Sequence, residues 1–215
     1  MLRSDHRSAT GGGRFVAAEL PLPTDAVVDP RLVAHGPALL ALEDGSVFRG
    51  VAFGAPVTAG GDLVVNTSQT GYQEICTDPS YAGQVVVMTY PLIGNYGRLL
   101  PDDQSARPWL RGLVVGHATA AVLEPAQQLV ALLGEWDVPA IAGLDTRLLA
   151  RTLRSTGSQR ALITAPGMTD PDAAVRLARE LPRWEDQDFV RDVSPRAPYE
   201  VGPAEGPLVA LIDYG

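Results

Sequence analysis

The sequence predicts an α/β fold, and three of its features carry that prediction. Short runs rich in valine and leucine are bounded by Gly, Pro, Asp or Ser, as is typical of buried β-strands. Downstream of residue 112 such runs alternate with stretches whose leucines recur at helical spacing. A chain in which strands and helices alternate in this way folds as an α/β structure.

The amino-terminal residues 1–37 are rich in glycine, proline and short polar side chains and show no sustained period, which predicts a disordered extension. Order is expected from Ala38. The runs 38–42 and 47–53 flank Asp44-Gly45, a pair that favours a tight turn, so they predict a β-hairpin.

Five further apolar runs, each ended by turn-forming residues, predict the remaining strands of a domain that spans residues 38–181. These runs are 62–66, 84–90, 112–116, 138–144 and 160–164.

Three helices are expected between and after these strands, at 125–136, 145–157 and 171–181. The first should begin near Pro125 and bury one stripe, formed by Leu129, Leu132, Leu133 and Trp136.

Local signals set the ends of the other two helices. Asp145 is suited to cap the first turn of 145–157, and Gly157 is expected to end that helix as a left-handed C-cap. Thr169 or Asp170 precedes Pro171 at the start of the last helix, and Pro182 stops it.

Residues 182–207 are broken by prolines and acidic side chains, so they read as a linker. The sequence LVALIDYG follows at 208–215 and resembles a central strand of a parallel sheet, which needs neighbours that these residues do not supply. It is therefore expected to be the first strand of a further, missing domain.

Composition excludes several function classes. A net charge of −8 and a pI near 4.8 argue against binding to nucleic acid or an anionic membrane. No run approaches the roughly 18 apolar residues of a membrane span. One cysteine and no apolar export signal indicate the cytoplasm.

The sequence has no lysine, so it contains neither a G-x-x-x-x-G-K-[ST] phosphate loop nor a Schiff-base lysine. Its three histidines, at 6, 35 and 117, are widely spaced, and no C-x-x-C or H-x-x-x-H pair occurs. We therefore expect no metal and no cofactor in this chain.

Cys76, the lone cysteine, lies in the polar stretch NTSQTGYQEICTDPSY at 66–81. A nucleophilic thiol needs a nearby base, and the sequence around Cys76 offers no histidine closer than His117. Thr70 and Gln73 have the T-x-x-Q spacing of a capping box, which would place Cys76 inside a short helix as a small buried residue. No catalytic residue is predicted.

Asp78-Pro79-Ser80-Tyr81 follows this helix. Pro79 forces a turn that can present the Ser80 hydroxyl outward. From these residues alone, the simpler interpretation is a serine that bonds its own turn.

Four segments together resemble the amino-terminal part of the carbamoyl phosphate synthetase small subunit. They are LEDGSVFRG at 42–50, NTSQTGYQEICTDPSYAGQVVVMTYPLIGNYG at 66–97, IAGLDTRLLARTLRSTGSQRALI at 141–163 and LVALIDYG at 208–215. The resemblance implies a β/β/α swivelling domain, followed by the first strand of a flavodoxin-like class I glutamine amidotransferase domain. The catalytic residues of that second domain would then be missing here.

The resemblance also implies one site residue, because the serine of the D-P-S-Y turn contacts bound glutamine in that family. Ser80 is accordingly predicted to bind glutamine. The neighbours that could line the same interface, with caps and core contacts as the alternative, are Asn66, Thr70, Tyr72, Gln73 and Glu74. Asp145 and Arg147 also match the family pattern, although a helix cap and a solvated arginine explain them equally well.

The expected function follows from this resemblance. The complete protein would hydrolyse glutamine and pass ammonia to a large subunit, which uses hydrogencarbonate and ATP with Mg²⁺ to make carbamoyl phosphate for arginine and pyrimidine biosynthesis. The present chain would keep the docking role without the chemistry. Two alternatives remain, a non-catalytic module that binds and modulates the large subunit and an independent amidase that uses Cys76.

Overall fold

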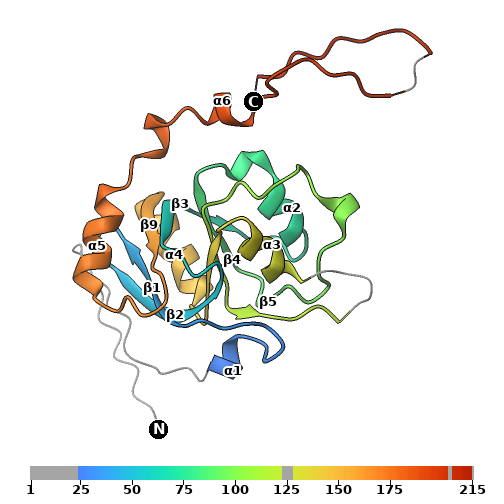
Figure 1. Cartoon of the computed structure of the whole chain (residues 1–215). Helices are drawn as coiled ribbons and strands as arrows, with labels where there is room; N and C mark the ends of the chain where they lie inside the picture. Colours follow the sequence, from blue (N-terminus) through green and yellow to red (C-terminus); the bar gives the residue numbers. More distant parts are fainter. Residues whose placement is uncertain (1–23, 123–127, 203–204, 215) are drawn as a thin grey trace.

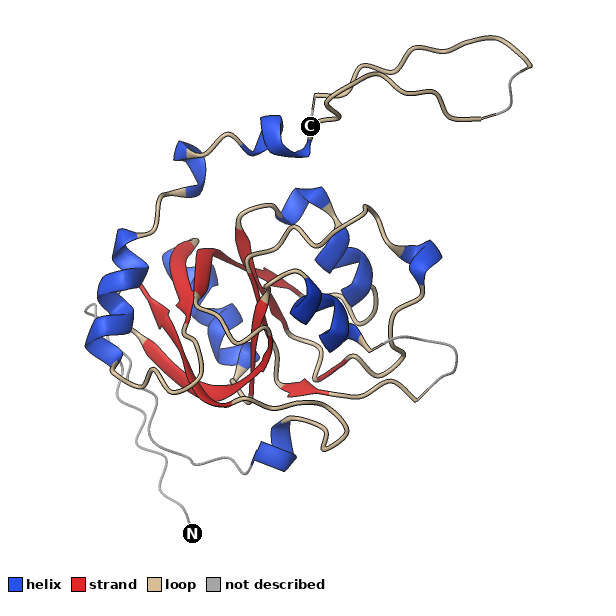
Figure 2. Cartoon of the chain, viewed as in Figure 1, coloured by secondary structure: helices blue, strands red, loops and turns tan. Residues whose placement is uncertain are grey.

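Seven strands form a closed barrel in the computed structural model, which describes residues 24–122, 128–202 and 205–214 (Figures 1 and 2). Their order around the barrel is β1-β2-β8-β6-β4-β3-β9, and β9 pairs with β1 to close it. The bounds are β1 Gly36–Leu42, β2 Val47–Gly54, β3 Ala59–Asn66, β4 Gln84–Met88, β6 Gly112–Val114, β8 Pro139–Ala142 and β9 Gln159–Ile163.

Helices surround this barrel, so the expected mixed α/β class is confirmed (Figure 2). They are α1 Thr24–Val27, α2 Tyr72–Thr77, α3 Leu129–Glu135, α4 Thr146–Thr156, α5 Pro171–Glu180 and α6 Phe189–Val193. A small parallel pair, β5 Leu92–Ile93 and β7 His117–Ala118, was not expected from the sequence. None of the helices in the described ranges is long and apolar enough to cross a membrane.

The predicted hairpin is confirmed, because β1 and β2 pair in antiparallel register. Gly45 has a φ of 98°, and the carboxylate of Asp44 accepts a hydrogen bond from the Ser46 amide at 2.7 Å. The chain from β3 to β4 instead crosses through α2, and that longer connection allows these two strands to run parallel.

The ends of α4 and α5 follow the local signals, whereas α3 begins at Leu129, after an extended Gln128, and so later than the expected start near Pro125. Asp145 caps α4 by accepting a hydrogen bond from the Leu148 amide at 2.8 Å, and Gly157 ends α4 with a φ of 83°. Asp170 caps α5, and Pro171 occupies its first position. Residues 123–127, including Pro125, lie outside the described residues.

Alternate side chains of β4 enter two different core clusters. Val85 and Val87 belong to the cluster that includes Leu149 of α4. Val86 and Met88 belong to the cluster that includes Cys76 of α2 and helix α3. Because both faces of this strand are buried, its sequence is continuously apolar and does not alternate.

One side chain of the predicted α3 stripe is placed differently. Leu129, Leu132 and Leu133 are buried, but Trp136 follows the end of α3 and is 42% exposed. The helix stops one residue earlier than its apolar pattern suggested, and Asp137 takes a φ of 53° immediately after.

The predicted extension over residues 1–37 is too long at its carboxyl side. Val27 and Val28 are buried in the core cluster, and the Asp29 amide donates to the Ala118 carbonyl at 2.9 Å. The His35 ring bonds the Gly54 carbonyl at 2.8 Å. Order therefore begins by Thr24, because apolar side chains in this segment find a place beside β7. Residues 1–23 lie outside the described residues.

The predicted linker, residues 182–207, is also partly folded. Trp184 and Phe189 stack with their ring centroids 5.6 Å apart, and Phe189 begins helix α6. Beyond α6 the chain extends away from the barrel (Figure 1). Residues 208–214 form no strand, and their apolar side chains are exposed.

Candidate functional site

The turn Asp78-Pro79-Ser80-Tyr81 links α2 to β4 and forms a single 3₁₀ turn over Pro79–Tyr81. Asp78 has an extended backbone, as expected before proline. Its carboxylate accepts a hydrogen bond from the Ser80 amide at 2.8 Å, and its carbonyl accepts one from the Tyr81 amide at 3.1 Å. The cap of this turn is therefore Asp78.

Ser80 itself is exposed, and in the described parts of the chain its hydroxyl makes no hydrogen bond. The simpler interpretation was that the Ser80 hydroxyl caps its own turn. The Asp78 carboxylate takes that role instead. The backbone at Ser80 is held in place while its Oγ faces solvent, which is a suitable arrangement for binding a polar ligand.

The carboxyl end of β3 is hydrogen-bonded to the same turn. Asn66, the last residue of β3, donates from Nδ2 to the Tyr81 hydroxyl at 2.9 Å. Its Oδ1 accepts a hydrogen bond from the Ser68 amide at 2.8 Å. Asn66 therefore supports the turn from one side.

The side chain of Gln73 in α2 forms hydrogen bonds with the loop that follows β5. Its Nε2 donates to the Leu99 carbonyl at 2.6 Å and to the Asp103 carboxylate at 2.7 Å, and its Oε1 accepts from the Leu99 amide at 2.9 Å. The predicted capping box is consequently wrong. Helix α2 begins after Gly71 with no side-chain cap, and Thr70 is exposed.

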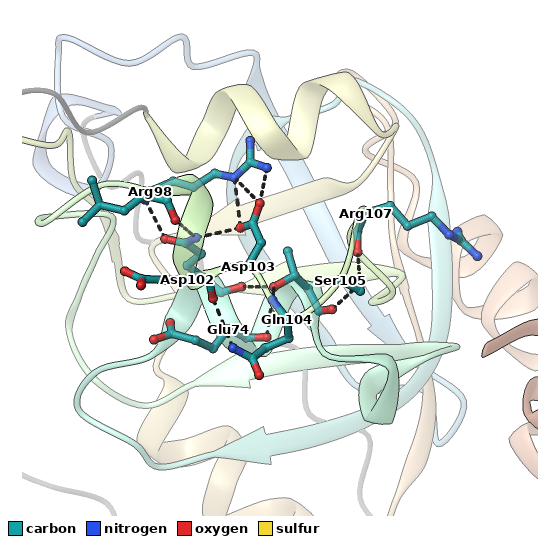
Figure 3. Close-up of polar contacts among 10 residues, drawn as sticks. Glu74, Arg98, Asp102, Asp103, Gln104, Ser105 and Arg107 are labelled. Carbon is teal, nitrogen blue, oxygen red and sulfur yellow. Dashed lines mark hydrogen bonds and ion pairs between the residues drawn. The ribbon is translucent and has the colours of Figure 1, made fainter. Parts of the chain in front are cut away.

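Figure 3 shows this loop lying against α2, with Arg98 folded over Asp103. Burial raises the pKa of Asp103, but hydrogen bonds from Arg98 and Gln73 and the positive charge of Arg98 outweigh it, so the pKa lies below its usual value. The Thr77 hydroxyl accepts a hydrogen bond from the Gln104 amide at 3.0 Å, and the Thr77 carbonyl accepts one from the Ser105 hydroxyl at 2.6 Å (Figure 3). The helix that precedes the Ser80 turn is therefore rigidly supported.

The fold and this turn belong to residues that match a known family. The pattern of the carbamoyl-phosphate synthase small chain, CPSase domain, matches residues 40–163, more than half of the chain. The chain belongs to this family.

Curated relatives agree with the assignment. Carbamoyl phosphate synthase small chains of Symbiobacterium thermophilum and Chlorobaculum tepidum are each 45% identical, over 81% and 83% of this chain. That of Aquifex aeolicus is 44% identical over 83% of this chain. The alignments cover 49%, 50% and 52% of these relatives, so the chain spans about half their length.

In this carbamoyl-phosphate synthase small-chain domain, Cys76 is fully buried in α2. Burial, with a smaller contribution from the nearby carboxylates of Asp103 and Glu74, raises the pKa of its thiol to about 12. His117 is exposed on β7, and no hydrogen bond joins Cys76 to a histidine of the described residues. A thiol held in its neutral form is a poor nucleophile, so the geometry favours a structural role for Cys76.

The remaining candidates have structural explanations too. Asp145 is a helix cap and Arg147 is exposed on α4. Tyr72 is buried, whereas Glu74 is half-buried and Thr70 is exposed. Among the residues that the structure describes, no cluster of three or more His, Cys, Asp or Glu could hold a metal ion.

Proposed function

We propose that this domain is the docking half of the small subunit of a glutamine-hydrolysing carbamoyl phosphate synthetase. The complete subunit hydrolyses glutamine and delivers ammonia to a large subunit. The large subunit carries ATP and Mg²⁺ and makes carbamoyl phosphate from hydrogencarbonate for arginine and pyrimidine biosynthesis. Family membership supports this role, and the absence of lysine from the sequence agrees with ATP chemistry on the partner.

The observation that carries the glutamine-site proposal is the geometry of the Ser80 turn. The Asp78 carboxylate already satisfies the backbone of the turn, which leaves the Ser80 hydroxyl exposed. A hydroxyl in this position can accept a hydrogen bond from the glutamine ammonium or donate one to its carboxylate. We assign Ser80 to one wall of the glutamine site.

The opposite wall and the glutaminase chemistry are assigned to a flavodoxin-like amidotransferase domain, and residues 208–214, which form no strand here, would pair as its first strand when that domain is present. The exposed apolar side chains Leu208, Val209, Leu211 and Ile212 support this assignment, because a parallel strand is covered on both faces. The preceding barrel is then the β/β/α swivelling domain of the family. The buried lone thiol of Cys76 is compatible with a reducing cytoplasm.

The test is Ser80→Ala in the protein that carries the amidotransferase domain, assembled with its large subunit. The KM for glutamine should rise roughly two- to tenfold, the effect of losing one hydrogen bond. Synthesis driven by added ammonia should not change, because ammonia bypasses the glutamine site. Ser155→Ala, which removes an exposed hydroxyl of α4, is the matched control. An unchanged KM in the Ser80 variant would remove Ser80 from the site.

A second candidate function is a non-catalytic module that binds the large subunit and modulates it. The inaccessible thiol of Cys76 favours this alternative for the domain acting by itself. Adding the 215-residue chain to the large subunit with ammonia as the nitrogen source tests it. A change in the rate of carbamoyl phosphate synthesis would support modulation, and an unchanged rate despite binding would exclude it.

A further inference from the structure

Residues 181–193, here called the strap, run from the end of α5 through α6 beside the barrel (Figure 1). A β-carbon at Gly60 of β3 would lie 2.6 Å from Cδ1 of Leu181. A β-carbon at Gly83 would collide with the ring of Phe189. The strap therefore packs closely on both glycines, and the Phe189 ring leaves no room for a side chain at Gly83.

The strap also makes a directed bond to the end of the Ser80 turn. The indole Nε1–H of Trp184 donates to the Ala82 carbonyl at 2.9 Å, although the Trp184 side chain is 39% exposed. Ala82 is buried, and its own amide donates to the Pro79 carbonyl at 3.0 Å. One residue thus connects the strap with the backbone that carries Ser80.

Stacking of Trp184 on Phe189 and contact of Phe189 with Gly83 complete the anchor. Gly83 has a φ of 79°, which reverses the chain between the turn and β4. Trp184 therefore bonds Ala82 and Phe189 packs on Gly83, the two residues that join the Ser80 turn to the barrel.

We propose that Trp184 and Phe189 are positioning residues for glutamine binding, which hold the Ser80 turn in place through Ala82 and Gly83. This inference rests on the proposed function of Ser80. Neither ring needs to touch glutamine for this effect.

The experiment first measures amide hydrogen exchange of the 215-residue chain. Trp184→Phe removes the indole N–H and keeps an aromatic ring, so the amides of Tyr81 and Ala82 should exchange about two- to tenfold faster. Trp136→Phe is the matched control, because the Trp136 indole is half-exposed and bonds no described residue. Phe189→Leu should act in the same direction as Trp184→Phe, through lost packing on Gly83.

The second measurement uses the complete small subunit assembled with the large subunit. Trp184→Phe should raise the KM for glutamine roughly two- to tenfold with kcat nearly unchanged, and should add little in the Ser80→Ala background. Equal effects of Trp184→Phe with and without Ser80, or exchange rates identical to the unsubstituted chain, would overturn the strap proposal. If Ser80→Ala alone leaves the KM unchanged while Trp184→Phe still speeds exchange, the glutamine role of Ser80 is overturned and the anchoring of the turn is supported.

Discussion

The rings of Tyr72 and Tyr96 stack on each other, and the hydroxyl of each tyrosine accepts a hydrogen bond from the backbone amide of the other. Their rings stack with centroids 4.1 Å apart. The Tyr96 amide donates to the Tyr72 hydroxyl at 3.0 Å, and the Tyr72 amide donates to the Tyr96 hydroxyl at 3.3 Å. The pair joins the start of α2 to the loop after β5, and it therefore supports the helix that leads into the Ser80 turn.

Tyr72→Phe should lower the free energy of unfolding by about 1–3 kcal/mol, the range for leaving buried polar groups without a partner. The lost hydroxyl donates to the Gly97 carbonyl at 3.0 Å and accepts from the Tyr96 amide, and both groups would be left unpaired. Urea denaturation measures the change. Tyr199→Phe removes an exposed hydroxyl and should leave stability unchanged. Equal stabilities of the two variants would contradict the structural role of the pair.

Stability should depend on pH through Asp103. Burial raises its pKa, but Arg98 and Gln73 lower it by more, so the folded pKa lies below the unfolded one. The unfolded chain then binds the proton more readily as pH falls. The stabilisation of the fold by ionised Asp103 is complete above the unfolded pKa of about 4. It is lost as the pH drops through the lower folded pKa.

Asp103→Asn should therefore be less stable than the unsubstituted chain near neutral pH, with a difference that shrinks as the pH falls below the unfolded pKa of about 4. Denaturation midpoints at a series of pH values provide the measurement. The exposed neighbour Asp102, changed to Asn, serves as the control and should keep the original pH dependence. A difference that stays constant with pH would show that Asp103 acts by packing alone.

The Cys76 thiol should resist labelling in the folded chain. It is fully buried, and its pKa is raised to about 12 mainly by that burial. At pH 8 a thiol reagent should modify it only at the rate of unfolding, and denaturant should accelerate the reaction. For the same reason, the 215-residue chain should release no ammonia from glutamine. Ammonia release that Cys76→Ser abolishes would establish the amidase alternative.

Truncation should separate the strap from the segment that follows it. Removing residues 195–215 deletes the exposed apolar side chains of 208–214 and should lower aggregation, as measured by light scattering at equal concentration. Removing residues 183–215 also deletes Trp184 and Phe189, and should cost about 2 kcal/mol of stability through lost aromatic packing. If both shortened chains unfold at the same denaturant concentration, the strap adds nothing to the barrel.

Local features of the fold were readable from the sequence because each depends on a few adjacent residues. The Asp44-Gly45 hairpin and the Asp145 cap formed as predicted. Helix α4 also ends at Gly157 with a positive φ, although its ψ of −177° is not that of the left-handed cap expected there. The family resemblance was likewise contained in contiguous motifs, and the match over residues 40–163 confirmed it. The glutamine contact of Ser80 came from that resemblance and stays a prediction.

Contacts between distant residues were decided only by the tertiary structure. Thr70 and Gln73 have the spacing of a capping box, yet Gln73 bonds Leu99 and Asp103, more than 20 residues away, because the packed loop offers it three partners. Trp184 lies in a segment with the composition of a linker, yet it bonds Ala82, which is 102 residues away in the sequence. Sequence spacing encodes the hydrogen bonds that a turn or helix makes with itself. Which side chains meet across the fold depends on how the barrel closes, and that closure, β9 against β1, joins segments about 120 residues apart whose pairing no local pattern specifies.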